Sequence, residues 1–332
     1  MTSLAMIEIL DGGYFSTIQD LGRYGWGQFG VPRSGAVDEF ALRAANRLVG
    51  NPDELACIEI GLGGFRFRAL KNLLMAVCGK GFSLRLDGQL MSLWQSIAVQ
   101  SGQIVQVDHE GGGMWAVIAF HGGIDVKPLM GSRSTSLVGG FGGGFGRFLM
   151  KGDQLKIGEP VKGQEGIRDR SFSIEAIQYY QPDPVIRVVV GPHSSWFNQD
   201  VYNSFFQKTY VISSSSNRSG YRLQGEPLTV NFSGNLISLG MLPGAIQIPP
   251  NGEPIVMMAD SPTSGGYPII GVVIRADLPL LAQCEPLRSQ IQFCSVSPEQ
   301  AREAYMVLSR RLEFLDTDPY NSELWERAGS IQ

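Results

Sequence analysis

Cysteine and histidine are scarce in this chain of 332 residues, which has four cysteines and three histidines. The cysteines are scattered through apolar runs, so we expect buried reduced thiols, which suit a cytoplasmic protein. The histidines stand far apart, and none lies in a His/Cys cluster with the spacing of a zinc site. The sequence therefore gives no sign of a metal centre.

Long apolar runs and an excess of basic residues are also missing. No apolar run approaches the roughly 20 residues that a membrane span needs. The N-terminal segment MTSLAMIEILDGGYF lacks the basic region of a signal peptide. The formal net charge is −4 and no basic stripe is present, which argues against nucleic acid as a partner. We therefore expect a cytoplasmic protein that binds neither nucleic acid nor a membrane.

Self-contained catalytic motifs are absent as well. There is no G-x-S-x-G nucleophile elbow and no biotin attachment sequence. The glycine run Gly139–Gly146, which we expect to be a flexible turn, lacks the G-K-[ST] and the helix of a Walker A loop. Gly111–Ala116 fits G-x-G-x-x-A but leads into a strand pattern, which excludes a dinucleotide site. Backbone amides of Gly131–Ser136 could bind an anion. Any chemistry would come from positioned charged and hydrogen-bonding groups.

Glycine and short strand-like runs dominate what is present. The chain has 42 glycines and is 43% hydrophobic. Strand patterns separated by turns predict a mostly β protein built as a barrel or sandwich. The length allows two domains: we expect an N-terminal domain at 1–165, a linker at 166–183, a C-terminal domain at 184–315 and a tail at 316–332. In the first half the predicted strands are Met6–Leu10, Cys57–Ile60, Phe65–Phe67, Leu73–Val77, Ser83–Leu86, Ile104–Val107 and Trp115–Phe120.

Two segments have the features of capped helices, and a short amphipathic helix is also expected at Trp196–Phe206. An apolar stripe at helical spacing follows Ser34, which we expect to cap the first helix, and ends at Gly50. Ser297-Pro298-Glu299-Gln300 has the form of a capping box with proline at the first helical position, and predicts a second helix. Asp277 is expected to cap a short turn before it.

The stretch Ile246–Pro268 combines strand patterns with closely spaced polar side chains. Two β-prone runs joined by a Pro/Asn-Gly turn predict a hairpin. In the loop that follows, Gly265 and Gly266 should adopt positive φ and let the chain bend tightly. A long surface turn is the alternative, but functional groups gather on loops held by rigid strands. The polar residues of this loop are Asp260, Ser261, Thr263, Ser264 and Tyr267.

Arginines lie in two glycine-containing loops, one in each predicted domain. The first loop holds Asp20, Arg23 and Arg33, and the second holds Asn217 and Arg218. An exposed Asp–Arg pair would contribute under about 1 kcal/mol, whereas a guanidinium group directed at a ligand matches a carboxylate or phosphate. The sequence leaves both interpretations open. Each loop contains Arg-x-Gly, which hints at internal duplication.

Several segments taken together resemble one family. They are TIQDLGRYG (Thr17–Gly25), GVPRSGAVDEFALRAAN (Gly30–Asn46), SNRSGYRL (Ser216–Leu223), PGAIQIPPNGEPIV (Pro243–Val256) and TSGGYP (Thr263–Pro268). This set is similar to the biotin-dependent carboxyltransferase-like family, also called allophanate hydrolase subunit 2 or KipA-like. The resemblance covers roughly residues 6–301.

The resemblance implies two cyclophilin-like β-barrel domains and a chain that works with partner subunits. Family members include one component of the ATP-dependent 5-oxoprolinase, which opens 5-oxo-L-proline (pyroglutamate) to L-glutamate. We expect this activity, with a Kip-inhibitor-like B subunit and a barrel-type A subunit as partners and with ATP held by the complex. One alternative is the carboxyltransferase component of a biotin-dependent urea or amide carboxylase. Another is a non-enzymatic regulator that binds a Kip-type kinase inhibitor.

The resemblance also implies roles for individual residues. Catalytic roles fall on Arg218, Tyr221, Asp260 and Tyr267. Substrate-binding roles fall on Asp20, Arg23, Arg33, Asn217, Arg222, Thr263, Gly265 and Gly266. The arginines would hold a carboxylate or phosphate, and the hydroxyl and glycine loop would orient a carbonyl oxygen.

Two positions depart from the pattern common in the family. Ser219 and Ser264 stand where relatives usually have methionine and threonine, which should change the packing of the pocket more than its charge. If Arg218 contacts the ligand, Arg218→Ala should abolish turnover and leave the melting temperature unchanged.

Overall fold

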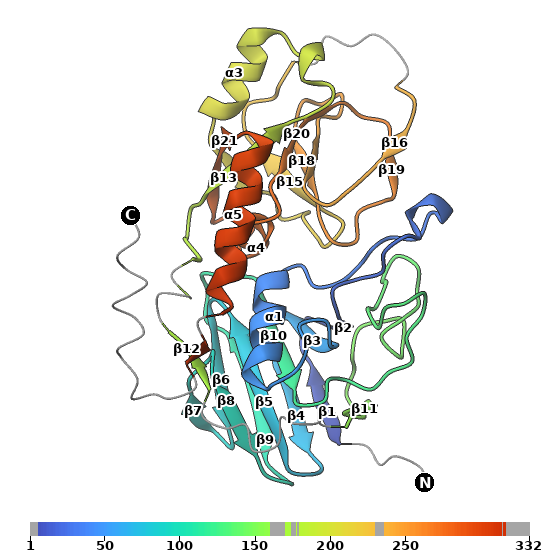
Figure 1. Cartoon of the computed structure of the whole chain (residues 1–332), viewed down its shortest axis with the longest axis vertical. Helices are drawn as coiled ribbons and strands as arrows, with labels where there is room; N and C mark the ends of the chain where they lie inside the picture. Colours follow the sequence, from blue (N-terminus) through green and yellow to red (C-terminus); the bar gives the residue numbers. More distant parts are fainter. Residues whose placement is uncertain are drawn as a thin grey trace.

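The computed structural model consists of two β-rich lobes joined side by side (Figure 1). The sandwich contains the strands within residues 7–155, and the barrel contains the strands within residues 185–295. The predicted linker at 166–183 lies partly, and the tail at 316–332 almost entirely, outside the described residues. The described residues are 6–159, 170–173, 177, 179–229, 236–313 and, for the backbone, 315–316.

Two antiparallel sheets make up the sandwich. The first contains β1 (Ile7–Gly12), β4 (Phe65–Ala69), β6 (Phe82–Leu86), β7 (Gln89–Met91), β9 (Ile104–His109) and β11 (Gln154–Leu155). The second contains β2 (Phe15–Gln19), β3 (Cys57–Gly61), β5 (Leu73–Gly79), β8 (Ser96–Val99) and β10 (Trp115–Phe120). Their strand orders are β11-β1-β4-β9-β6-β7 and β2-β3-β10-β5-β8. The predicted strands are confirmed within a few residues at their ends; β2, β7, β8 and β11 were not predicted.

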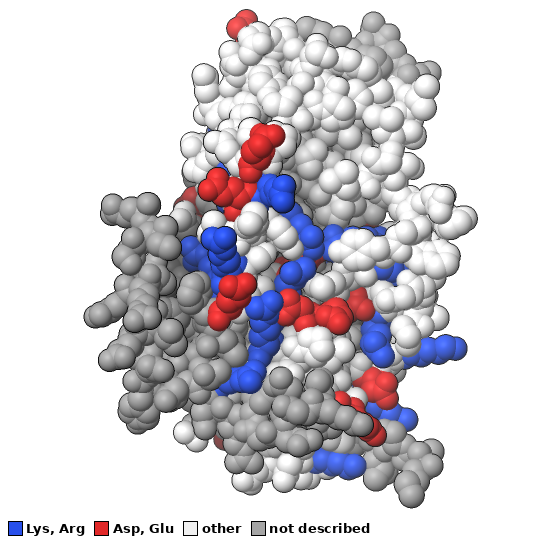
Figure 2. Space-filling model, viewed as in Figure 1, with Lys and Arg blue, Asp and Glu red and all other residues white. Residues whose placement is uncertain are grey.

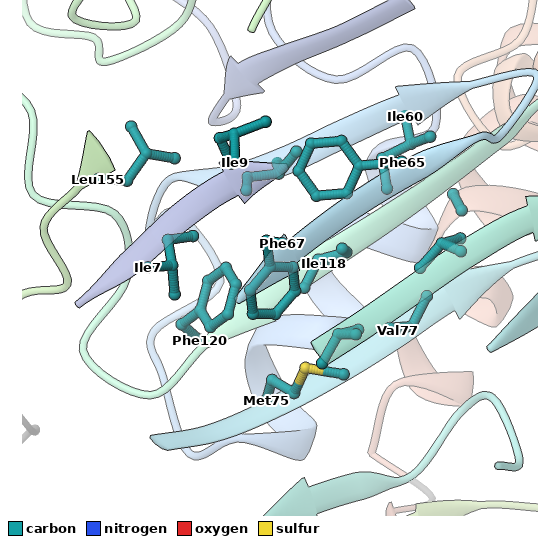
Figure 3. Close-up of a cluster of buried hydrophobic side chains, with 14 of the residues drawn as sticks. Ile7, Ile9, Ile60, Phe65, Phe67, Met75, Val77, Ile118, Phe120 and Leu155 are labelled. Atoms are coloured by element: carbon teal, nitrogen blue, oxygen red, sulfur yellow. The ribbon is translucent and has the colours of Figure 1, made fainter. Parts of the chain in front are cut away.

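Hydrophobic side chains from both sheets meet between them (Figure 3). Ile7 and Phe67 come from the first sheet, and Ile118 and Phe120 come from the second. The rings of Phe67 and Phe120 meet edge to face with their centroids 5.5 Å apart. Because side chains alternate between the faces of a strand, the apolar residues of each strand line one side of the sheet. Burial of each large side chain contributes about 1.5–3 kcal/mol.

The helix α1 (Glu39–Leu48) covers the outer face of the second sheet, where it packs on β5 and β10. Its apolar stripe is buried, and it ends before Gly50, whose φ is 72°. The expectation that Ser34 caps this helix is wrong: the side chain of Asp38 accepts the hydrogen bond from the amide of Ala41 at 2.9 Å. Ser34 lies one turn too early along the chain.

Seven strands close the barrel in the order β13-β20-β17-β18-β15-β14-β21. They are β13 (Val185–Val190), β14 (Tyr210–Ile212), β15 (Gly220–Gln224), β17 (Ala245–Gln247), β18 (Ile255–Met257), β20 (Ile269–Val273) and β21 (Gln290–Ser295). The predicted hairpin is confirmed, because β17 and β18 pair antiparallel with Ile246 opposite Val256. Beside the barrel, the short strands β16 (Leu239–Gly240) and β19 (Ser264–Gly265) form a separate pair. The mostly β fold expected from the sequence is therefore present.

The helix α5 (Pro298–Arg311) runs along one side of the molecule from the barrel to the sandwich (Figure 1). Its predicted capping box is confirmed: Ser297 Oγ accepts from the amide of Gln300, and Gln300 Oε1 accepts from the amide of Ser297. Leu308 joins the buried residues of α1 in one hydrophobic cluster. Of the described helices, none is long and apolar enough to cross a membrane.

Charged side chains gather over α1 and α5 on this side of the molecule, whereas the barrel above them carries few (Figure 2). Glu39 on α1 forms ion pairs with Arg33 and with Arg275, which follows β20. Asp277 precedes α4 (Leu278–Ala282), but its carboxylate binds Arg187 and makes no capping hydrogen bond, contrary to the prediction. Of these ion pairs, Glu39–Arg275 joins the two lobes on the side of α1 and α5.

Candidate functional site

A cleft lies between the sandwich and the barrel, away from α5. It contains cavities of about 480 and 240 Å³. Residues 30–32 and Phe141 line the larger cavity from the sandwich, and Thr263 lines it from the barrel. Ser219 and Asp260 line both cavities. The cleft is thus built by segments far apart in the sequence, and Asp260 lies where its two cavities adjoin.

Arg218 lies in the turn between β14 and β15 and crosses from the barrel to the sandwich. Its Nε donates to Asp260 Oδ2 at 2.8 Å and its Nη2 to Asp260 Oδ1 at 3.4 Å. Its Nη1 donates to Glu59 on β3, and Nη2 also donates to the carbonyl of Gly35 at 2.7 Å. Four of the five N–H groups of an arginine are therefore occupied by this chain. Arg218 joins the lobes and orients Asp260.

The local backbone explains the position of Arg218. Asn217 Oδ1 accepts a hydrogen bond from the amide of Ser219 at 2.8 Å, which closes a turn around Arg218. The amide of Asp260 donates to the carbonyl of Arg218 at 2.9 Å. Backbone and side-chain contacts together hold Arg218 and Asp260 as one unit, while Asn217 itself is exposed.

Glu59 is the main residue of the site that sequence reasoning missed. It lies fully buried in the apolar strand CIEIG, where its Oε2 accepts from the amide of Val37 at 2.6 Å. Burial raises the pKa of Glu59 to about 7, although the guanidinium of Arg218 opposes that rise. Burial alone would lower the pKa of Arg218, but Asp260 and Glu59 more than reverse this, so Arg218 stays protonated. In the sequence, the signal that could have indicated Glu59 was a single carboxylate within an otherwise apolar strand pattern.

Asp20 is used within the sandwich and lines neither cavity of the cleft. Its carboxylate accepts from Ser132 Oγ at 2.6 Å, from the amide of Gly22 at 2.8 Å, and also from Ser134 Oγ and the amide of Arg133. The segment Gly131–Ser136, expected to bind an anion through its amides, thus binds a carboxylate of this chain. The amide and hydroxyl donors of this segment therefore already have an anionic partner, the carboxylate of Asp20.

Arg33 and Arg23 do not pair with Asp20 in the described part of the chain. Arg33 pairs with Glu39, stacks on Tyr24 at 4.5 Å and lines a separate cavity of about 40 Å³ beside α1. Arg23 is only 2% exposed and donates from Nη2 to the carbonyl of Ser134. Its guanidinium carbon lies 4.9 Å from the ring centroid of Phe141. Arg23 therefore lies against a residue that lines the larger cavity.

The remaining predicted residues occupy different surroundings. Tyr221 lines the smaller cavity but is 2% exposed, and its hydroxyl accepts from Trp115 Nε1 at 3.1 Å and donates to the carbonyl of Ala282 at 2.9 Å. Burial raises the pKa of Tyr221. Tyr267 is 45% exposed and lines neither cavity, and Arg222 is exposed on β15. The structure thus does not bring Tyr267 and Arg218 together in the cleft.

The prediction that Gly265 and Gly266 bend the loop through positive φ is wrong. Neither has φ in the left-handed region, and Gly265 belongs to β19, opposite Leu239. A Cβ on Gly265 would lie 2.5 Å from Gln247 Nε2. Gly265 thus packs closely against a side chain, which no sequence pattern distinguished from a bend.

A second polar cluster sets how the lobes meet. Gln283, which follows α4, accepts from the amides of Met114 at 2.9 Å and Trp115 at 3.1 Å. Its Nε2 donates to Asp38 Oδ2 at 2.7 Å, which also accepts from the hydroxyl of Tyr180 at 2.7 Å. Burial raises the pKa of Asp38 to about 6. This cluster ties β10 and Asp38 of the sandwich to Gln283 at the barrel.

Thiol and metal chemistry have no support in the described residues. All four cysteines are free, and burial raises the pKa of Cys284 to about 12. Within the described ranges, His, Cys, Asp and Glu do not gather in a group of three or more that could hold a metal ion. The chemistry available in the cleft is that of Asp260, hydroxyl groups and arginines.

Residues 29–295 match the family described as carboxyltransferase domain, subdomain A and B. The C subunit of the 5-oxoprolinase of Escherichia coli (strain K12) is 38% identical over 310 residues, which are 93% of this chain and 97% of that protein. The corresponding 5-oxoprolinase C subunit of Haemophilus influenzae is 35% identical over 89% of this chain and 93% of that protein.

Longer proteins also contain a similar region. The urea amidolyase of Saccharomyces cerevisiae is 32% identical over 89% of this chain but only 17% of its own length. The crystal structure of the Kluyveromyces lactis urea carboxylase superposes with a TM-score of 0.85 at 29% identity, over 94% of this chain and 29% of that one.

Proposed function

Because the chain belongs to the carboxyltransferase domain, subdomain A and B, family, we propose that it is the C subunit of an ATP-dependent 5-oxoprolinase. The observation that carries the proposal is the match to a 5-oxoprolinase C subunit over nearly the whole length of both chains. The urea amidolyase match covers a small part of that protein, so it supports a carboxyltransferase less well.

The reaction converts 5-oxo-L-proline, ATP and two molecules of water to L-glutamate, ADP and phosphate. An unstrained lactam is a poor electrophile, and phosphorylation of its oxygen activates the carbonyl carbon. One water adds to that carbon, the C–N bond breaks and the nitrogen leaves as the amine; the second water hydrolyses the resulting acyl phosphate and releases phosphate. A cavity of about 480 Å³ is of the size that holds small-molecule ligands. The part of this chain is to hold and orient the lactam there, with Ser219 and Thr263 as hydrogen-bonding groups.

Asp260 is the residue that we assign to proton transfer in the cleft. Arg218 holds it from one side, and it lines both cavities on the other. A carboxylate oxygen in this position can accept a proton from attacking water. Arg218 itself acts through Asp260 and is a positioning residue.

Turnover requires partner subunits. We assign these to a Kip-inhibitor-like B subunit and a barrel-type A subunit, with ATP bound by the complex. The relatives are named as the C subunit of their enzyme, which supports an assembly of several chains.

The test is to purify this chain with its two partners and measure ATP-dependent release of glutamate from 5-oxo-L-proline. Asp260→Asn should lower kcat by about 100-fold or more. Asp277→Asn is the matched control, because Asp277 is also a buried carboxylate paired with an arginine but lies outside the cleft. The Asp277→Asn variant should be less stable than the wild type and should keep the wild-type turnover.

The result also separates the alternatives. A complete complex that binds tightly but releases no glutamate would refute the proposed reaction and favour a regulator. Carboxyl transfer from carboxybiotin in place of glutamate release would favour the carboxyltransferase.

A further inference from the structure

Arginines that stack on aromatic rings form a recurring pair in this protein. Arg33 on Tyr24, Arg147 on Phe145, Arg218 over Trp115 and Arg275 on Tyr305 are four such pairs. Each of these arginines also binds a carboxylate of the chain. Arg23 on Phe141 has the ring but no carboxylate within ion-pair distance among the described residues.

Arg147 shows what Arg23 lacks. Arg147 stacks on Phe145 at 4.7 Å, and its two terminal nitrogens each donate to Asp153 at 2.8 Å. Arg23 stacks on Phe141 at 4.9 Å, yet its Nε and Nη1 are buried without any hydrogen-bond partner. Leaving a buried charged donor unsatisfied is costly, and native proteins do so rarely.

Arg23 lines neither cavity itself, but residues around it belong to the cleft. Phe141, the ring on which it stacks, lines the larger cavity, and Asp260, which raises the pKa of Arg23 against the effect of burial, lines the same cavity. In Arg218, in contrast, every nitrogen already has a hydrogen-bond partner in this chain. Of the two arginines in the Arg-x-Gly loops, Arg23 is the one whose Nε and Nη1 have no hydrogen-bond partner.

The surrounding charge disfavours a ligand with two negative charges relative to a ligand with one. Asp20 and Asp260 both act on Arg23 electrostatically, and Glu59 and Arg218 lie beyond Asp260. The two arginines face three carboxyl groups. A doubly charged phosphate would therefore meet more repulsion than a carboxylate would.

We propose that Arg23 and Phe141 form the subsite for the carboxylate of a small acid. When the ring of Phe141 turns aside, the carboxylate accepts hydrogen bonds from the unpartnered N–H groups of Arg23, as Asp153 does from Arg147. The acid is 5-oxo-L-proline, so this assignment rests on the proposed function. It places the lactam ring in the larger cavity beside Asp260 and Thr263.

The experiment compares 5-oxo-L-proline with its primary amide, which keeps the ring and lacks the charge. Calorimetry on the purified chain and on the complex gives both dissociation constants, and kinetics of the complex give KM and kcat. Wild type should prefer the acid at least about tenfold. Arg23→Gln should weaken acid binding about 10- to 100-fold, leave amide binding unchanged and raise KM more than it lowers kcat. Arg23→Lys should restore part of the preference.

Arg147→Gln is the matched control, because it removes an arginine from a ring in the same loop region. It should leave both dissociation constants unchanged. If Arg23→Gln does not fold, Phe141→Leu tests the subsite instead. Removal of the covering ring should increase the preference for the acid over the amide several-fold. An unchanged preference would overturn the subsite.

The outcomes separate the two proposals. Equal loss of acid and amide binding in Arg23→Gln, or a wild type with no preference, would overturn the subsite even if the complex turns over. A complex without turnover that still binds the acid through Arg23 would refute the reaction and leave the subsite standing.

Discussion

Arg218→Ala tests whether this arginine serves the ligand or the architecture. The sequence-based expectation was lost turnover at an unchanged melting temperature. The structure leads to the opposite expectation for stability, because Arg218 is 6% exposed and its removal leaves Glu59 and Asp260 buried without their cation. Breaking a buried ion pair by removing one partner costs about 3–5 kcal/mol.

The magnitude can be followed by thermal unfolding. At about 2–4 °C per kcal/mol for a protein of this size class, the melting temperature should fall by roughly 10 °C. The loss should shrink at about pH 5.5 relative to about pH 8, because a stranded carboxylate with a raised pKa takes up a proton. Arg218→Ala combined with Glu59→Gln should recover part of the stability, since one stranded charge is gone.

Arg222→Ala is the matched control. Arg222 lies four residues further along the chain, on β15, and its side chain is exposed. Its removal should change the unfolding free energy by no more than about 0.5 kcal/mol. Equal melting temperatures for Arg218→Ala and Arg222→Ala would refute the assignment of Arg218 as the residue that ties the lobes together.

Two further predictions concern pH and the glycine run. Glu59 and Asp38 bind a proton more tightly in the folded than in the unfolded chain, with pKa values of about 7 and about 6. Their contribution to stability is therefore full below the unfolded pKa values and is lost as pH rises to about 7. In thermal melts, Glu59→Gln should reduce the dependence of the melting temperature on pH, and an unchanged dependence would contradict this prediction. Gly140→Ala introduces only the strain of a positive φ of 66°, about 1–2 kcal/mol. Gly142→Ala adds a Cβ 2.1 Å from the carbonyl of Ser134, so it should destabilise the protein clearly more in chemical denaturation, whereas equal losses would indicate a flexible run.

Local features were predictable where a short stretch of sequence is sufficient to form them. The capping box at Ser297 and the hairpin of β17 and β18 depend on neighbouring residues, and both are present. The cap of α1 was misplaced because Ser34 and Asp38 both have the chemistry of a cap, and only the path of the backbone selects between them.

The candidate site was predictable by residue type but not by role. Asp20 and Arg23 lie close in sequence, yet the carboxylate turns to Ser132 and Ser134, and the guanidinium turns to Phe141. Glu59 escaped notice because nothing in a five-residue strand reveals an arginine 159 positions away. Partners at such separations depend on how the lobes are placed.

The amino-acid sequence by itself determined the β-rich lobes, the helices, the capping box of α5 and the stock of arginines and hydroxyl groups near strand ends. These follow from periodicity and turn chemistry, which act over a few residues. Only the tertiary structure decided that Arg218 binds Glu59 and Asp260 while Arg23 keeps unpartnered donors near the larger cavity. The physical reason is that a donor or acceptor forms hydrogen bonds only with groups within about 3 Å. Which groups lie that close is determined by the fold.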